Sequence, residues 1–383
     1  ADELQASELF LHTSSRWRCR KRRVLNCRRL AFPPPPRNAT STTSATSATA
    51  TATDDPATTP HPCDVVARAL RLSFSAHSEL DARSLATFLD AAAEVKRCNL
   101  RRLSEVERLT FCLNAYHLMV NHAYLVLGPP SSSRAWLSYF NTIAYEAGGD
   151  IFSLSELEHC IIRANSAPPA NFLSRFVIPR SRYAFALHAT PDPRVTLALN
   201  CGSCCNPPSV QVFERARLDA QLHAASCALL RDSVQVYSSR GATTIALPRA
   251  CQWYARDFSA SGSPLKCAQA VLPYLEGEQR ACLDACLKAN CAATSGPPPS
   301  VLFLPFDFTC RPLSLRTAAD AAADAAADAD APPPGEITRE ITRDHREITR
   351  EISLAASPVP RGARRNTGTL TAEVVSVECA ERG

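Results

Sequence analysis

The stretch SEVERLTFCLNAYHLMVNHAYLVL, residues 104–127, is a long apolar segment in which a few polar side chains recur at helical spacing. On a helix, Asn114, His117 and Asn121 share one face, and His122 lies in an overlapping stripe with Asn114. An unpaired buried polar group costs about 1–3 kcal/mol, so these side chains need partners in so apolar a helix. Two interpretations stay open: the stripe lines a site or supplies a base, or it forms a satisfied network in the core.

The segments on either side of this helix predict an α+β fold. Apolar periodicity indicates helices, and the shorter runs of strand-forming residues come mainly in the second half of the chain. Clustered helices followed by strands favour a helix-rich first half packed on a small mixed or antiparallel sheet. The further helices are expected at residues 65–72, 80–95, 154–163, 218–230 and 282–291, and the strands at 183–187, 195–200, 234–237, 243–247 and 301–308.

Both ends of the chain differ in composition from its middle. Residues 1–37 hold nine Lys or Arg against three acids, and a Thr/Ser/Ala run without hydrophobic periodicity follows the prolines at 33–36. Such a run cannot offset its ordering entropy by burial. We therefore expect disordered tails at residues 1–62 and 313–383, the second rich in Ala/Asp and Ile-Thr-Arg-Glu repeats, and one globular domain at residues 63–312.

The net charge of +5 comes from the Arg-rich first segment, and the rest of the chain is nearly neutral. A neutral body gives no support to nucleic-acid binding by the globular domain. No stretch approaches about 18–20 uninterrupted apolar residues, which argues against a transmembrane helix.

The 17 cysteines are odd in number and scattered, so free thiols in a reducing, intracellular compartment are expected. The cytoplasm is the default location. A genuine Arg-rich first segment would instead be typical of an organelle transit peptide or a nuclear localisation patch.

The most unusual local sequence is NCGSCCNPP, residues 200–208, which follows an apolar run. Gly202 permits an unusual backbone angle or a close backbone approach, and loops after buried strands often carry reactive residues. Cys201 as a nucleophilic thiolate would need a nearby base and a lowered pKa. The alternatives are zinc binding by Cys201, Cys204 and Cys205 with a histidine, a redox pair of Cys201 and Cys204, and incidental buried thiols.

Residues 152–163, FSLSELEHCIIR, predict the start of another helix. Ser153, followed three residues later by Glu156, matches a capping box. Glu158 and His159 are adjacent, so their side chains point in different directions. A single histidine such as His159 is more often structural than catalytic.

Five ordered motifs resemble the domain of unknown function 547 family over roughly residues 64–310. The matching pieces are residues 111–122, 145–149 with 152–163, 192–202, 253–258 (WYARDF) and 305–308 (PFDF). Cys201 matches a cysteine of the family pattern, whereas Asn206 stands where bacterial members carry a second one. Cys204 and Cys205 are not features of the pattern, which weakens the metal and redox-pair interpretations and strengthens a single-thiol role.

Our first hypothesis is a polar cleft in which a thiol-dependent hydrolase or transferase uses Cys201 as nucleophile, with His122 or His159 as the base. We expect Arg163 and Arg194 to bind an anionic group or to pair with Glu158. The residues expected to orient the base or bind substrate are Asn114, Tyr116, Glu158, Arg163, Arg194 and Asn200. No metal or cofactor is expected.

The second hypothesis is a non-enzymatic protein-interaction or scaffold domain whose polar motifs are buried structural networks. The resemblance leaves both hypotheses open, because the family has no established activity. In plants its domain often follows a leucine-zipper region, which suggests an interaction role, but no zipper is visible upstream here. The exposure of the polar motif residues distinguishes the two hypotheses. Polar residues that line one open pocket favour a functional site, and full burial with mutual hydrogen bonds favours a structural role.

Overall fold

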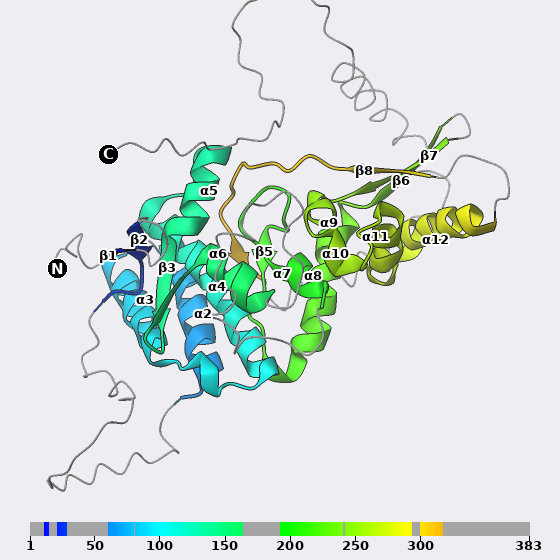
Figure 1. Ribbon diagram of the computed structural model, residues 1–383. Coiled ribbons are helices and arrows are strands. Elements are labelled where there is room, and N and C mark those ends of the chain that lie inside the picture. Colours follow the sequence, from blue (N-terminus) through cyan, green and yellow to red (C-terminus); the bar gives the residue numbers. More distant parts are fainter. Residues whose placement is uncertain are drawn as a thin grey trace, which may run out of the picture. The chain divides into compact units, whose positions relative to one another are not determined.

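The computed structural model describes residues 11–14, 21–28, 60–79, 81–163, 192–239, 242–292 and 299–316, and Figure 1 shows the order of their elements. The fold is α+β, as predicted. The long helices of the first half are α2 (Pro62–Glu79), α3 (Ala82–Glu94) and α4 (Glu105–Leu127). Helix α2 packs between α3 and α4.

Helix α4 runs through the larger hydrophobic core. It begins with a capping box, in which Ser104 and Glu107 satisfy each other's backbone N–H groups. Residues 111–124 are buried without interruption. A helix buried on all sides cannot leave its polar side chains to solvent, so they take partners from neighbouring elements: Asn114 bonds to Phe213, and Asn121 to Ser73.

The described strands form three small sheets, two of them mixed. The first has the order β1 (Leu11–Ser14), β2 (Lys21–Val24), β3 (Ile143–Ala147) and β4 (Asp150–Ser153), with β2 and β3 parallel and the other pairs antiparallel. In the second, β6 (Gln235–Ser239) is antiparallel and β8 (Ser300–Phe303) is parallel to the central β7 (Ala242–Leu247). The third pairs β5 (Ser209–Val210) with β9 (Ser314–Leu315).

Shorter helical segments connect these elements. The second sheet and its helices enclose a separate hydrophobic core. The remaining helices are η1 (Val95–Arg97), η2 (Leu100–Arg102), α5 (Ser133–Thr142), α6 (Leu154–Glu156), the π-helical η3 (Leu157–Ile162), α7 (Arg194–Ala198), η6 (Arg215–Arg217), α8 (Leu218–Arg231), α9 (Arg249–Trp253), α10 (Ala255–Phe258), α11 (Pro264–Val271), η7 (Leu272–Tyr274) and α12 (Gly277–Ala292). None of the helices described is long and apolar enough to cross a membrane.

Part of the expected N-terminal tail is folded. Strand β2 pairs with β3, and Val24 and Leu25 are buried. Arg22 is buried as well, because its guanidinium donates to the Glu156 carboxylate at 2.7 Å and to the Ile151 carbonyl at 2.6 Å. The expected disordered tail at residues 1–62 is therefore wrong for residues 21–28, and residues 11–14 also form a strand of this sheet. Most of the expected C-terminal tail lies outside the described residues, although β9 falls at its start.

The expected strand at 195–200 is also wrong, because these residues form helix α7 and a short extended exit. The carboxylate of Asp192 accepts the Arg194 N–H at 2.9 Å and so stabilises the first turn of this helix. A short apolar run fits a buried strand and a buried helical turn equally well. The expected strand at 301–308 ends at Phe303, and the one at 183–187 lies outside the described residues.

Asn114 offers a test of the network that holds α4. Its amide donates to the Phe213 carbonyl at 2.9 Å and accepts the Phe213 N–H at 2.8 Å. We expect Asn114→Ala to lower the free energy of unfolding by about 2–4 kcal/mol, because two buried backbone groups lose their partner. Denaturant unfolding measures the change. As a control, Asn290→Ala on half-buried surface of α12 should stay within about 0.5 kcal/mol, and equal losses in the two variants would contradict the bracing role.

Candidate functional site

Glu158 lies where several of the sequence motifs meet. It belongs to the π-helical turn η3, in which the Arg163 N–H donates to the Glu158 carbonyl at 2.9 Å. Such turns are frequent at functional sites. The Tyr254 hydroxyl donates to one carboxylate oxygen at 2.7 Å, and the Tyr116 hydroxyl to the other at 3.4 Å. Burial first and the charge of Glu158 second hold the pKa of both hydroxyls well above the usual range, so both remain donors.

Of the two candidate bases, His159 is the one that lies beside this carboxylate. Its Nδ1 is 3.8 Å from Glu158 Oε1, which is too long for a hydrogen bond. Its ring centroid is 6.4 Å from that of Tyr254. The role of His159 as a base stays a prediction.

The other candidate base, His122, lies in the core. Its side chain is fully buried, with Nδ1 2.6 Å from the Tyr145 hydroxyl and its ring edge against Phe88. Burial lowers the pKa of the imidazole to about 3. A ring with that pKa binds a proton too weakly to serve as a base near neutral pH. In this structure His122 packs between α4, α3 and β3, which favours a structural role, and its expected role as a base stays a prediction.

Asn114 and Asn200, both expected to orient a base or substrate, bond to the backbone instead. Asn200 donates to the Pro207 carbonyl at 2.7 Å and accepts the Gly202 N–H at 3.0 Å. Its own N–H donates to His117 Nε2 at 3.2 Å, which ties the loop to α4. These bonds fix the backbone on both sides of the loop that carries Cys201.

Cys201 is partly exposed at the start of this loop. Its thiol donates to Asn206 Oδ1 at 3.1 Å. Gly202 has a φ of +81°, and a Cβ there would lie 2.7 Å from the Tyr124 ring, so the close approach expected at this glycine is confirmed. The Tyr124 hydroxyl in turn donates to the Cys201 carbonyl at 2.7 Å.

The thiol of Cys201 is not activated in this structure. Burial raises its pKa to about 12, and the negative charge of Glu158 acts in the same direction, while a bond from the Ser203 backbone opposes them. At pH 7 this corresponds to roughly one thiolate in 10⁵ molecules, since each pKa unit is a factor of ten. A nucleophilic role would require a substrate or partner that lowers this pKa.

Cys204 and Cys205 bond to the chain that precedes β9. The Cys204 N–H donates to the Thr309 carbonyl at 2.9 Å, and the Cys205 sulfur accepts the Asp307 N–H at 2.9 Å. Within the described parts of the chain, no group of three or more His, Cys, Asp and Glu side chains could hold a metal ion.

Both arginines expected to bind an anionic group or Glu158 pair with other carboxylates. Arg163 is completely buried and lies 2.5 Å from Asp257, whose side chain is 1% exposed. The guanidinium also stacks on the Tyr254 ring at 3.8 Å. Arg194 pairs with Asp192 and Asp219, each at 2.8 Å. Asp257 was not selected as a site residue from the sequence, although its place in the WYARDF motif was a signal.

A series of ring contacts connects the two tyrosines that bond to Glu158, and of its members only Tyr116 was expected at the site from the sequence. Tyr116 contacts Phe140, which stacks on Trp136 with centroids 4.6 Å apart. Trp136 contacts Phe306 at 5.9 Å, and Phe306 contacts Trp253, the neighbour of Tyr254, at 4.9 Å. This circuit of contacts returns to the carboxylate, and we call it the Glu158 site: Glu158, Tyr116, Phe140, Trp136, Phe306, Trp253 and Tyr254. Among its members, Glu158, Trp253, Tyr254 and Phe306 are partly exposed.

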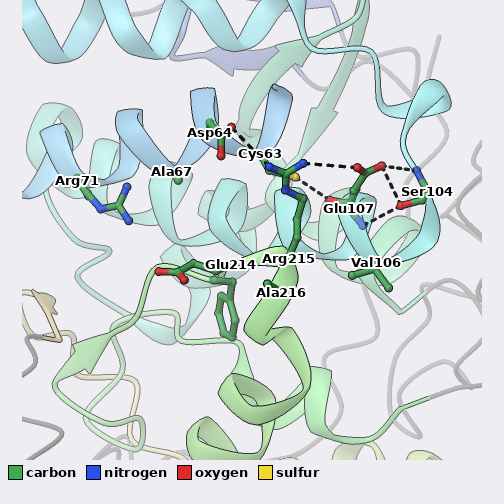
Figure 2. Close-up of a pocket in the computed structure, with 11 residues that line it drawn as sticks. Cys63, Asp64, Ala67, Arg71, Ser104, Val106, Glu107, Glu214, Arg215 and Ala216 are labelled. Atoms are coloured by element: carbon green, nitrogen blue, oxygen red, sulfur yellow. Dashed lines mark hydrogen bonds and ion pairs between the residues drawn. The ribbon is translucent and has the colours of Figure 1, made fainter. Parts of the chain in front are cut away.

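The larger of the described cavities contains none of the expected site residues. It has a volume of about 730 Å³ and is lined by residues 63–71 of α2, by the start of α4 and by residues 213–216. Figure 2 shows Arg215 between Asp64 and Glu107, at 3.6 and 3.7 Å. The Cys63 thiol, whose pKa burial raises to about 12, donates to the Glu107 carbonyl. Because its central arginine is already paired, this cavity is a weaker candidate than the Glu158 site.

Residues 100–229 match the model of a family described as protein of unknown function, DUF547. The matched stretch runs from η2 through α4 and η3 to α8 and includes the Cys201 loop. The resemblance expected from the motifs is therefore confirmed over these residues. No curated protein and no solved structure matches the chain.

The buried neutral state of His122 predicts a specific pH dependence. Its pKa is about 3 in the folded protein against 6.5 ordinarily, so the unfolded chain takes up a proton first as the pH falls. The contribution of the neutral imidazole to the free energy of unfolding is fully present above pH 6.5 and is lost progressively toward pH 3. We expect His122 to account for about 2 kcal/mol of the stability lost between pH 7 and pH 5.

Urea unfolding at pH 7 and pH 5 measures this contribution. His122→Phe should lower stability at pH 7 but show a smaller loss on acidification than the natural chain. The exposed His223 on α8 provides the control, since His223→Gln should leave the pH dependence unchanged. An unchanged pH dependence in His122→Phe would contradict a neutral buried imidazole.

Proposed function

We propose that this member of the DUF547 family is a binding domain that recognises a partner at the Glu158 site. The Glu158 carboxylate carries the proposal: its side chain is 14% exposed, two tyrosine hydroxyls hold it in place, and a series of ring contacts runs from Tyr116 to Trp253, the chain neighbour of Tyr254. A few fixed polar groups among aromatic rings are typical of recognition sites, because aromatic anchors supply contact area at low entropic cost.

The other polar motifs support this proposal through their burial. Asn114 and Asn200 bond to backbone, His122 bonds to Tyr145, and Arg163 is neutralised by Asp257. Full burial with mutual bonds is the pattern expected of structural networks, as in an interaction domain. The networks hold Glu158 and its tyrosines in a fixed geometry, and a fixed site loses less conformational entropy on binding.

A thiol-dependent hydrolase or transferase using Cys201 is the second candidate, favoured by the partial exposure of Cys201 near the same carboxylate. In such a reaction the sulfur would bond to an acyl carbon, the thiol proton would pass to the leaving group, and water would release the acid. Against it, forming the thiolate from a pKa of about 12 costs about 7 kcal/mol at pH 7.

We also propose that the partner is an intracellular protein. Free thiols in the described parts of the chain include those of Cys63, Cys98, Cys112, Cys201, Cys251 and Cys267, which supports a reducing compartment. Recognition of a protein by a small aromatic site is common, because a few well-placed anchors carry most of the binding energy.

Photo-crosslinking in cells tests the binding proposal. Phe308 is 38% exposed and contacts Phe306 of the site, so p-benzoylphenylalanine at position 308 should capture whatever binds there. We expect a crosslinked species that disappears in Glu158→Gln. The matched control is Glu214→Gln, an exposed carboxylate at the other cavity, which should keep the crosslink. Identical crosslinks in both variants would overturn the proposal.

Cys201 reactivity separates the two candidates. With limiting iodoacetamide at pH 7.5, we expect Cys201 to be labelled no faster than the exposed Cys204, because its thiol is protonated. Its labelling should rise steeply only as the pH approaches about 12. Peptide mass spectrometry gives the rate at each position. Preferential labelling of Cys201 at pH 7.5 would favour the enzyme over the binding domain.

A further inference from the structure

Counted over the described residues, the charges around the Glu158 site do not balance. Arg163 and Asp257 neutralise each other at 2.5 Å, and Arg22 lies 2.7 Å from Glu156. Within the described ranges, no Lys or Arg lies within 4 Å of the Glu158 carboxylate. The nearest basic group is the His159 imidazole at 3.8 Å. A largely buried carboxylate without a cationic partner is costly, and a bound cation would offset that cost.

The carboxylate also has unused hydrogen-bonding capacity. A carboxylate offers about four acceptor positions. The hydroxyls of Tyr116 and Tyr254 occupy one on each oxygen. The remaining positions are available to N–H donors of a ligand, since part of this side chain is exposed.

The neighbouring aromatic rings favour the same kind of ligand. A cation within about 6 Å of an aromatic centroid is attracted by the negative face of the ring, most strongly with tryptophan. Trp253, Tyr254 and Phe306 are partly exposed members of the site. Rings of this kind also pack well on the methylene groups that carry an ammonium.

Among the residues that the structure describes, an anionic ligand, by contrast, finds no free cation at this site. The guanidinium of Arg163 is completely buried against Asp257 and Tyr254. An incoming anion would meet the Glu158 carboxylate and the negative faces of the rings. The site therefore favours a ligand with a positive charge, whereas Arg163 was expected from the sequence to bind an anionic group.

We propose that the Glu158 site binds a primary alkylammonium group, with the nitrogen donating to the Glu158 carboxylate and the alkyl chain lying among Trp253, Tyr254 and Phe306. This inference rests on the proposed binding function and names the chemistry that it recognises. The group can come from a free amine or from a lysine side chain of a protein.

The experiment uses the full chain and small probes of defined chemistry. Binding of n-butylammonium is followed by saturation-transfer NMR and by tryptophan fluorescence, to which Trp136 and Trp253 contribute. We expect a dissociation constant on the order of millimolar for so small a ligand. The neutral isostere n-butanol and the quaternary cation tetramethylammonium, which lacks N–H donors, should both bind at least tenfold more weakly.

Variants locate the binding. Glu158→Gln keeps an acceptor for the tyrosines but loses the charge, and it should weaken butylammonium binding at least tenfold. Phe306→Leu should weaken it several-fold, and Glu214→Gln should have no effect. Circular dichroism and thermal unfolding check that each variant folds. Equal binding of butylammonium and butanol, or unchanged butylammonium binding by folded Glu158→Gln, would overturn the inference.

A last pair of probes identifies the source of the ammonium group. Tighter binding of Nα-acetyl-lysine methylamide than of butylammonium points to a lysine of a protein, and the reverse order points to a free amine. If no ammonium binds but the Phe308 crosslink still depends on Glu158, the ammonium inference fails and the binding function stands. If neither depends on Glu158, the proposed function itself fails.

Discussion

The burial of α4 on every side is the constraint on which the rest of the structure depends. Its polar side chains cannot reach solvent, so neighbouring elements supply partners at fixed positions to several of them. Asn114 fixes the chain at Phe213, and His117 fixes the Cys201 loop through the Asn200 N–H. His122 and Tyr145 fix the first sheet to the same helix. The burial of the apolar helix α4 thus determines where segments far away in the sequence are placed.

Two populations of polar residues follow from this arrangement. In the first, side chains bond to the backbone or pair with an opposite charge inside the protein, as with Asn114, Asn200 and the ion pair of Arg163 and Asp257. In the second, a polar group is held in place but keeps unused hydrogen-bonding positions among the described residues, and Glu158 is the clearest example. The first population keeps the second in position, because Arg163 stacks on Tyr254 and Tyr254 donates to Glu158.

The sequence alone predicted the long helices, the α+β class and the close approach at Gly202. These features depend on local periodicity and on the backbone freedom of a single residue. The sequence could not predict that His122 meets Tyr145 or that Arg163 meets Asp257, because both pairings depend on how distant segments pack. Strand β2 (Lys21–Val24) could not be recognised among its basic residues, since composition gives no sign that Arg22 is neutralised by Glu156. Trp136 gave no local signal that it belongs to the site.

The pairing of Arg22 with Glu156 has a consequence for the N-terminal boundary of the folded domain. Glu156 also accepts the Ser153 N–H at 2.8 Å, so this carboxylate organises the turn that leads into Glu158. A truncation that begins after Arg22 would take the guanidinium away from the buried Glu156 carboxylate and would shorten the strand that pairs with β3. Such a truncated protein would keep every recognisable motif and still lose part of the scaffold that holds the Glu158 carboxylate.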